Sequence, residues 1–164
     1  MRRFFSILTG LFLLASIQGQ VVSSSTWFAP AVAAGGEMIT DGDFPNSDNW
    51  STDDNFTVAG DSAAYDDVGN GYILQADGDM VSSIQGSTDY TLEFDIEIAS
   101  GNANFRIYNS ELGVTYVATD DYADGHHVVG FTTAADVGAG GILFYAYTDS
   151  SNPFGIDNIS LTAD

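Results

Sequence analysis

The sequence contains no cysteine, which excludes disulfide bonds, thiol nucleophiles and zinc–thiolate centres. Burial of apolar side chains must therefore hold the fold together. The 164 residues, of which 45% are hydrophobic, suffice for one such domain. Several short catalytic motifs are missing as well, since no G-x-S-x-G, H-E-x-x-H or glycine-rich phosphate loop occurs. These absences argue against the enzyme classes that such motifs mark.

Basic residues are almost as scarce. There is no lysine, and three arginines face 23 acidic residues, for a formal net charge of −20. Such a surface repels phosphate backbones and anionic lipids, so we expect neither nucleic-acid nor membrane-surface partners. Solubility in salty water explains the acidity, because salt screens self-repulsion beyond about 10 Å. Binding of divalent cations is the alternative explanation.

The N-terminus has the pattern of an export signal. Arg2 and Arg3 precede an apolar run at residues 4–17, as in the n-region and h-region of a signal peptide. This run is too short to indicate a membrane span. We therefore expect residues 1–33 to be an export signal peptide with a long c-region.

The expected cleavage site follows Ala33, with Ala31 at the −3 position. A cut near Gly19, an uncleaved anchor and a true start at Met38 are the alternatives. With cleavage after Ala33, residues 34–164 form a single extracellular domain, secreted or attached to a surface.

The rest of the chain predicts an all-β fold. The stretch YTLEFDIEI, residues 90–98, alternates apolar and polar residues without interruption, which is typical of a half-buried strand. Turn-forming residues recur every 8 to 12 positions, as in an antiparallel β-sandwich or barrel. The expected strands are 37–44, 56–58, 63–66, 72–76, 80–85, 90–98, 104–109, 114–119, 126–133, 142–148 and 155–162.

The strand at 90–98 is predicted to form a hairpin with the strand that follows it. A two-residue loop would place Asp95 opposite Arg106 and Glu93 opposite Tyr108. Apolar residues then meet on the other face, so both faces agree with the pairing rules for antiparallel strands.

Two terminal motifs and one central strand resemble a known group of domains. They are MITDGDFPNSDNW at residues 38–50, FGIDNISLTAD at 154–164 and STDYTLEFDIEI at 87–98. They resemble carbohydrate-binding modules of families four, nine and twenty-two, and also related domains of phage tail, virion and bacterial surface proteins. The resemblance implies a galactose-binding-like jelly roll whose first and last strands lie close together.

Many members of this group place a structural calcium ion near those strands. The resemblance implies that Asp157, in the closing motif, and Asp43, in the opening motif, are ligands. Pro45 replaces the glutamate of the family pattern, so one of the oxygen ligands that calcium requires is missing. The alternative for Asp157 is that its carboxylate accepts backbone N–H groups of the first-strand loop.

Sugars are bound by aromatic rings together with a few polar side chains. Tyr145 and Tyr147 are two positions apart, so on a strand they share one face at a spacing of about 7 Å. The predicted sugar-binding residues are Tyr145, Tyr147, Tyr108, Arg106, Glu93, Asp95 and Trp50. Alternatively, the tyrosines fill the edge of the sandwich, and Trp50 plugs the core.

Catalysis by the acidic strand is not expected. Glu93, Asp95 and Glu97 have the spacing of glycosidase carboxylates, which is about 5 to 9.5 Å, but they lie side by side on one flat face. His126 and His127 are adjacent and point to opposite faces of a strand. We therefore expect a monomeric, non-catalytic domain that binds polysaccharide or surface glycan. The alternative is a structural or adhesion domain of a virion or cell surface, without a sugar site.

Overall fold

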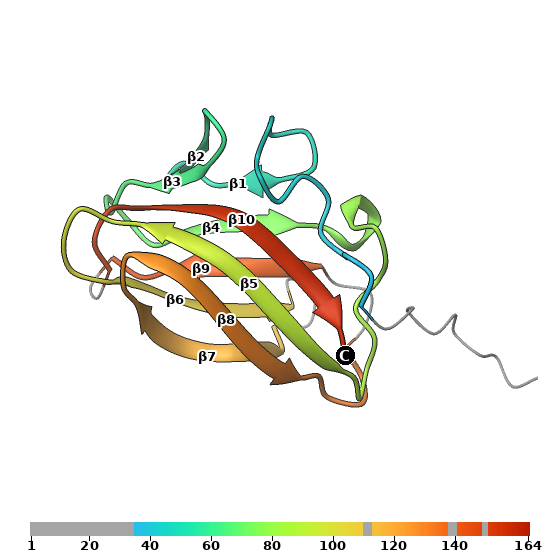
Figure 1. The fold of residues 1–164 in the computed structure, drawn as a ribbon. Helices are drawn as coiled ribbons and strands as arrows, with labels where there is room; N and C mark the ends of the chain where they lie inside the picture. The colour runs from blue at the N-terminus through green and yellow to red at the C-terminus, as the bar shows by residue number, and fades with distance from the viewer. Residues whose placement is uncertain (1–34, 110–112, 138–140, 149–150) are drawn as a thin grey trace, which may run out of the picture. The chain divides into compact units, whose positions relative to one another are not determined.

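The computed structural model describes residues 35–109, 113–137, 141–148 and 151–164. In it, two antiparallel sheets of five strands each pack face to face (Figure 1). This is the β-sandwich jelly roll that the sequence predicts. The expected signal peptide at residues 1–33 lies outside the described residues.

Each sheet combines strands that are distant in the sequence. The first sheet has the order β1 (Ser51–Thr52), β4 (Gly71–Gln75), β9 (Ile142–Ala146), β6 (Ala103–Asn109) and β7 (Thr115–Tyr122). The second has the order β2 (Phe56–Val58), β3 (Ala63–Tyr65), β10 (Phe154–Ala163), β5 (Asp89–Glu97) and β8 (Gly125–Thr132). One 3-10 turn, η1 (Asp77–Asp79), is the sole helical element of the described residues, none of which forms a helix able to cross a membrane.

Strand β5 shows how the sequence specifies these strands. Its apolar side chains Tyr90, Leu92, Phe94 and Ile96 are buried, whereas the polar side chains between them lie on the outer surface. The predicted alternation is therefore confirmed. Each of these buried side chains contributes about 1.5 to 3 kcal/mol to stability, so the strand cannot slip by one residue without exposing the whole set.

The hairpin predicted between β5 and β6 is wrong. Strand β5 pairs with β10 and β8, whereas β6 pairs with β9 and β7 in the other sheet. Asp95 therefore lies opposite Asp157 and His126, and Arg106 lies opposite Tyr145. The five residues between the two strands carry the chain from one sheet to the other.

The opening segment runs beside the closing strand, as the sequence predicts. The N–H of Met38 donates to the Leu161 carbonyl at 2.9 Å, and the N–H of Ile159 donates to the Gly42 carbonyl at 2.9 Å. The segment is not the continuous strand expected at residues 37–44, because it forms one isolated bridge and then turns through positive φ angles at residues 41 and 44. No strand forms at residues 80–85, and strand β1 was not predicted.

The end of β7 places a tyrosine deep among aromatic rings. The Tyr122 ring centroid lies 4.5 Å from that of Phe105 and 5.1 Å from that of Phe94. Burial raises the pKa of Tyr122 to about 12, and the charge of Asp120 adds to the effect. Because the unfolded chain releases this proton near pH 10, Tyr122 contributes stability that is fully present below pH 10 and is lost as the pH rises to about 12.

We therefore expect the free energy of unfolding to fall between pH 10 and 12, and the Y122F variant to lose part of that pH dependence. Urea unfolding at several alkaline pH values measures the effect. Absorbance at 295 nm should show one late-ionising phenol fewer in the variant. If Tyr122 ionised near pH 10 together with exposed tyrosines, this prediction would be wrong.

Candidate functional site

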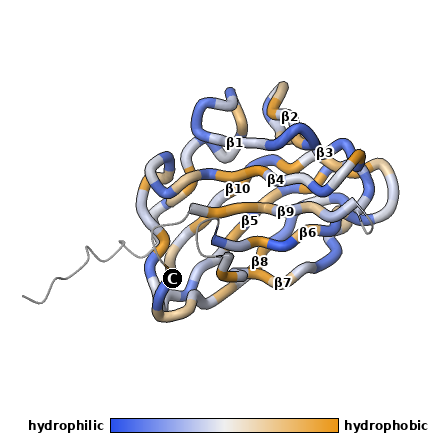
Figure 2. Tube along the Cα trace, turned by 180° about the vertical axis from the view of Figure 1, so that it is seen from behind, coloured by the Kyte–Doolittle hydropathy of each residue, from blue (hydrophilic) through white to orange (hydrophobic). Residues whose placement is uncertain are grey.

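The outer surface of the first sheet carries a row of tyrosines. Strand register places Tyr72 of β4, Tyr145 of β9 and Arg106 of β6 side by side across three neighbouring strands. A second row, two residues further along each strand, consists of Leu74, Leu143 and Tyr108. We call this surface the tyrosine face; its residues are Tyr72, Leu74, Arg106, Tyr108, Leu143, Tyr145 and Tyr147. Figure 2 views the molecule from the side of these strands.

The rings of the tyrosine face pack against one another around Arg106. The Tyr145 and Tyr147 centroids are 4.9 Å apart, and those of Tyr108 and Tyr145 are 6.2 Å apart. The Arg106 Cζ lies 4.5 Å from the Tyr108 centroid and 5.6 and 5.7 Å from those of Tyr145 and Tyr147. Cation–π contacts of this kind contribute about 0.5 to 1 kcal/mol each at exposed sites, so they hold the rings and the guanidinium in one arrangement.

Sequence reasoning brought four of these seven residues together and missed Tyr72, Leu74 and Leu143. Arg106, Tyr108, Tyr145 and Tyr147 were predicted as neighbours, and the structure places them so. Tyr72 was not predicted, although the alternation in GYILQ already points it to the side opposite the buried Ile73. What the sequence does not show is that β4 lies next to β9.

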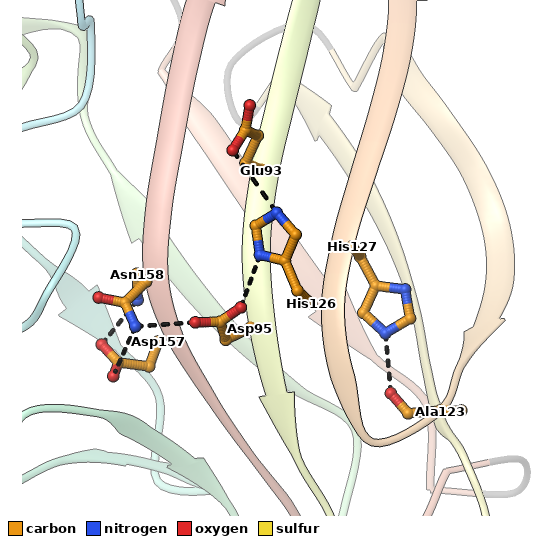
Figure 3. A network of polar contacts seen from close by, with 7 residues as sticks. All are labelled: Glu93, Asp95, Ala123, His126, His127, Asp157 and Asn158. Carbon is orange, nitrogen blue, oxygen red and sulfur yellow. Dashed lines mark hydrogen bonds and ion pairs between the residues drawn. The ribbon is translucent and has the colours of Figure 1, made fainter.

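Glu93 and Asp95 lie on the outer surface of the other sheet, away from the tyrosine face. Figure 3 shows His126 held between them, with its Nδ1 2.7 Å from the Asp95 carboxylate and its Nε2 3.6 Å from that of Glu93. The hydrogen bond with His126, followed by one from Asn158, lowers the pKa of Asp95. The predicted sugar cleft is therefore divided between two opposite surfaces.

Asp157 lies beside Asp95 on the neighbouring strand. Its carboxylate accepts the N–H of Asn158 at 2.6 Å, and the Asn158 amide donates to Asp95 at 2.8 Å (Figure 3). Burial raises the pKa of Asp157, and the charges of Asp95, Asp43 and Asp61 raise it further. Its N–H partner thus belongs to its own strand and not to the first-strand loop.

A hollow of about 320 Å³ opens beside these carboxylates. Its lining residues are Gly60, Asp61, Ser62, Asp95, Ile96, Glu97, Asp124, Gly125, Gly155 and Asp157. No aromatic side chain is among them. Over the described part of the chain, no three His, Asp or Glu side chains are placed to hold a metal ion together. Calcium binding by Asp157 and Asp43 stays a prediction from the resemblance.

Trp50 lies in the core and not at the rim of a binding surface. Its side chain is 5% exposed, and its ring centroid is 5.0 Å from that of Phe44. The indole N–H donates to the Asp41 carbonyl at 2.9 Å, which satisfies its one polar atom. No ring face is left for stacking on a sugar. The prediction that Trp50 binds sugar is therefore wrong, and the alternative, that it fills the core, is confirmed.

Comparison with known proteins relates the chain to carbohydrate-binding folds. No family model and no curated protein matches it. Among solved structures, a family four carbohydrate-binding module matches with a TM-score of 0.54 and 14% identity, over 77% of this chain and 99% of the module. The CBM22-1 xylan-binding domain of Paenibacillus barcinonensis Xyn10C matches with a TM-score of 0.52 and 11% identity, over 80% and 97%.

An arabinose-bound GH51 α-L-arabinofuranosidase matches as well, with a TM-score of 0.56 and 9% identity. The match covers 79% of this chain but 27% of that enzyme. At such low identities, the likeness concerns the fold alone. The chain therefore has the fold of the carbohydrate-binding modules that it matches.

Proposed function

We propose that this chain is a non-catalytic, extracellular glycan-binding domain that uses the tyrosine face. Four tyrosines on one sheet surface, three of them in contact with a single arginine, carry this proposal. The fold supports it, because carbohydrate-binding modules are among the structures that share it and one of them is named as a xylan-binding domain. Binding would keep the domain, and whatever bears it, close to a polysaccharide.

The chemistry of the face suits this task. The C–H face of a sugar ring stacks on an aromatic ring, while hydroxyl and guanidinium groups hydrogen-bond the sugar hydroxyls. Tyr108 and Tyr145 offer both features on neighbouring strands, because each is half-buried with one part of its ring open to solvent. Their mutual packing fixes the rings before a ligand arrives, which lowers the entropic cost of binding.

The acidic hollow on the other sheet is the weaker candidate. It lacks an aromatic side chain on which a sugar could stack. Asp95 and Asp157 lie side by side on adjacent strands, and Asp95 is engaged by His126 and Asn158. The two carboxylates of a glycosidase instead lie on opposite sides of the glycosidic bond that is cleaved. We therefore assign binding to the tyrosine face and propose no catalytic role.

We also propose that the domain acts as a monomer, with no nucleic-acid or membrane partner. The excess of acidic residues supports this part of the proposal. The alternative is a structural or adhesion domain of a virion or cell surface. Retention by polysaccharide separates the two, because only the glycan-binding domain needs an accessible aromatic surface.

Replacing Tyr145 and Tyr147 together with alanine is expected to weaken retention in polysaccharide affinity gels about 10-fold or more, because two stacking rings are lost. The melting temperature should fall far less than for a core substitution such as Phe105→Ala, because both side chains are only half-buried and lie outside the core between the sheets. Val128→Ala on the opposite surface, 60% exposed, is the matched control and should retain full binding. Equal retention of the double variant would remove these tyrosines from the site, and no retention of the unmodified domain on any polysaccharide would favour the adhesion alternative.

A further inference from the structure

Arg106 is the only lysine or arginine beyond residue 3, and the chain has 23 acidic residues. Despite this excess, no carboxylate of the described residues forms an ion pair with it. The ion pairs found in the described part of the chain involve His126 instead. In a chain with so many acidic residues, an arginine that pairs with no described carboxylate needs a physical explanation.

The hydrogen-bonding groups of Arg106 are equally unused. Its Nε is buried and has no hydrogen-bond partner in the described structure. A guanidinium has five N–H donors in one plane, and stacking on the Tyr108 ring engages its face while leaving the edge donors free. The edge donors of the guanidinium can therefore take up an anionic acceptor, and hydrogen bonds between charged groups are about twice as strong as neutral ones.

The strands around Arg106 are poor in acidic residues, whereas the central strands of the other sheet are rich in them. Strands β4, β6 and β9, which build the tyrosine face, contain no aspartate or glutamate. The strands β5 and β10 of the other sheet carry Asp89, Glu93, Asp95, Glu97 and Asp157. The edge strand β7 beside β6 carries Asp120 and Asp121, and the Asp121 carboxylate accepts a hydrogen bond from Asn104. The three strands that build the tyrosine face therefore contribute no carboxylate that would compete with a bound anion for Arg106.

We infer that Arg106 is an anion subsite within the tyrosine face, and that the glycan carries a carboxylate or a sulfate ester. The inference rests on the proposed glycan-binding function and adds the class of sugar to it. The tyrosine rings stack on the sugar ring, and the planar fork of Arg106 binds the anionic group through two parallel N–H···O bonds. Hydroxyl groups of a neutral sugar would leave the charge of Arg106 unpaired.

The test compares each acidic polysaccharide with its neutral counterpart at 0.15 M salt. Polygalacturonate is paired with its fully methyl-esterified form, and a sulfated galactan with the same galactan after desulfation. We expect the unmodified domain to bind at least one acidic form about 10-fold more tightly than its neutral partner, as charge-assisted hydrogen bonds predict. The pair that shows this preference identifies the anion as carboxylate or sulfate.

Variants at Arg106 assign the preference to this side chain. Arg106→Gln should weaken binding of the acidic form about 10-fold more than it weakens binding of the neutral form, so that the preference for the acidic form is lost. Arg106→Lys keeps the charge but loses the fork, so it should recover binding only in part. Asn104→Ala, on the same strand but outside the subsite, should keep the preference for the acidic form.

The outcomes separate this inference from the proposed function. Equal binding of acidic and neutral forms, or an Arg106→Gln variant that keeps the preference, overturns the anion subsite while glycan binding stands. Retention of neutral polysaccharide alone would likewise overturn the anion subsite and leave glycan binding in place. No retention of any form overturns both.

Discussion

Replacing Phe105 with alanine is expected to lower the free energy of unfolding by about 3 to 5 kcal/mol. Phe105 lies on β6, is 1% exposed, and points into the space between the sheets. Its ring centroid is 4.5 Å from that of Tyr122, 5.6 Å from that of Phe94 and 5.7 Å from that of Phe154. Strands from both sheets thus meet at this one ring, and its removal leaves a cavity that rigid strands cannot close.

Urea unfolding followed by tryptophan fluorescence measures the effect of the F105A variant. Arg106→Gln, on the next residue of the same strand but on its outer side, is the matched comparison and should change stability by much less. If the two variants were equally destabilised, β6 would not separate a core side from a binding side. Phe105→Leu should fall between them, because it keeps part of the buried volume.

Phe105 also shows what could and could not be predicted from the sequence. The alternation along β5 and β6 assigned Phe94 and Phe105 to apolar faces, and both are buried. The same alternation made a β5–β6 hairpin look consistent, yet the two strands lie in opposite sheets. In a sandwich, every strand turns its apolar side to one shared core, so matching faces do not identify the strand that is hydrogen-bonded.

This limit explains the result for the candidate site. Residues close together in the sequence, such as Tyr145 of β9 and Tyr147 just after it, were grouped correctly because local spacing alone places them on one side. Glu93 and Asp95 were grouped with Arg106 through the mistaken hairpin, and the structure puts them on the opposite surface. Strand order depends on long-range packing, which a pattern of period two does not encode.

The sequence also failed to predict where unusual backbone angles end a strand. The segment at residues 37–44 reads as a strand, but Asp41 and Phe44 adopt φ angles of 52° and 46°. Such left-handed conformations are uncommon for residues other than glycine and end regular pairing. Trp50 reads as a candidate surface aromatic, but it packs on Phe44 in the loop that these turns create.

Replacing Gly42 with alanine is expected to destabilise the domain by about 3 kcal/mol or more, on the scale of severe overpacking. A Cβ at this position would lie 1.8 Å from the Ile159 carbonyl oxygen. That oxygen belongs to the backbone of β10 and cannot rotate away as a side chain can. The Ile159 N–H also donates to the Gly42 carbonyl, so any shift that relieves the clash weakens this hydrogen bond as well.

Gly78→Ala is the matched control, because a Cβ on Gly78 would meet no heavy atom within 4 Å. It should change the free energy of unfolding by no more than about 0.5 kcal/mol. Denaturant unfolding compares the two variants, and hydrogen exchange at the Ile159 amide reports the local contact. Equal stability of both would mean that the opening segment does not lie against β10. A selective loss in the Gly42 variant explains why the opening motif has glycine here: only a residue without a side chain lets the two ends of the domain approach so closely.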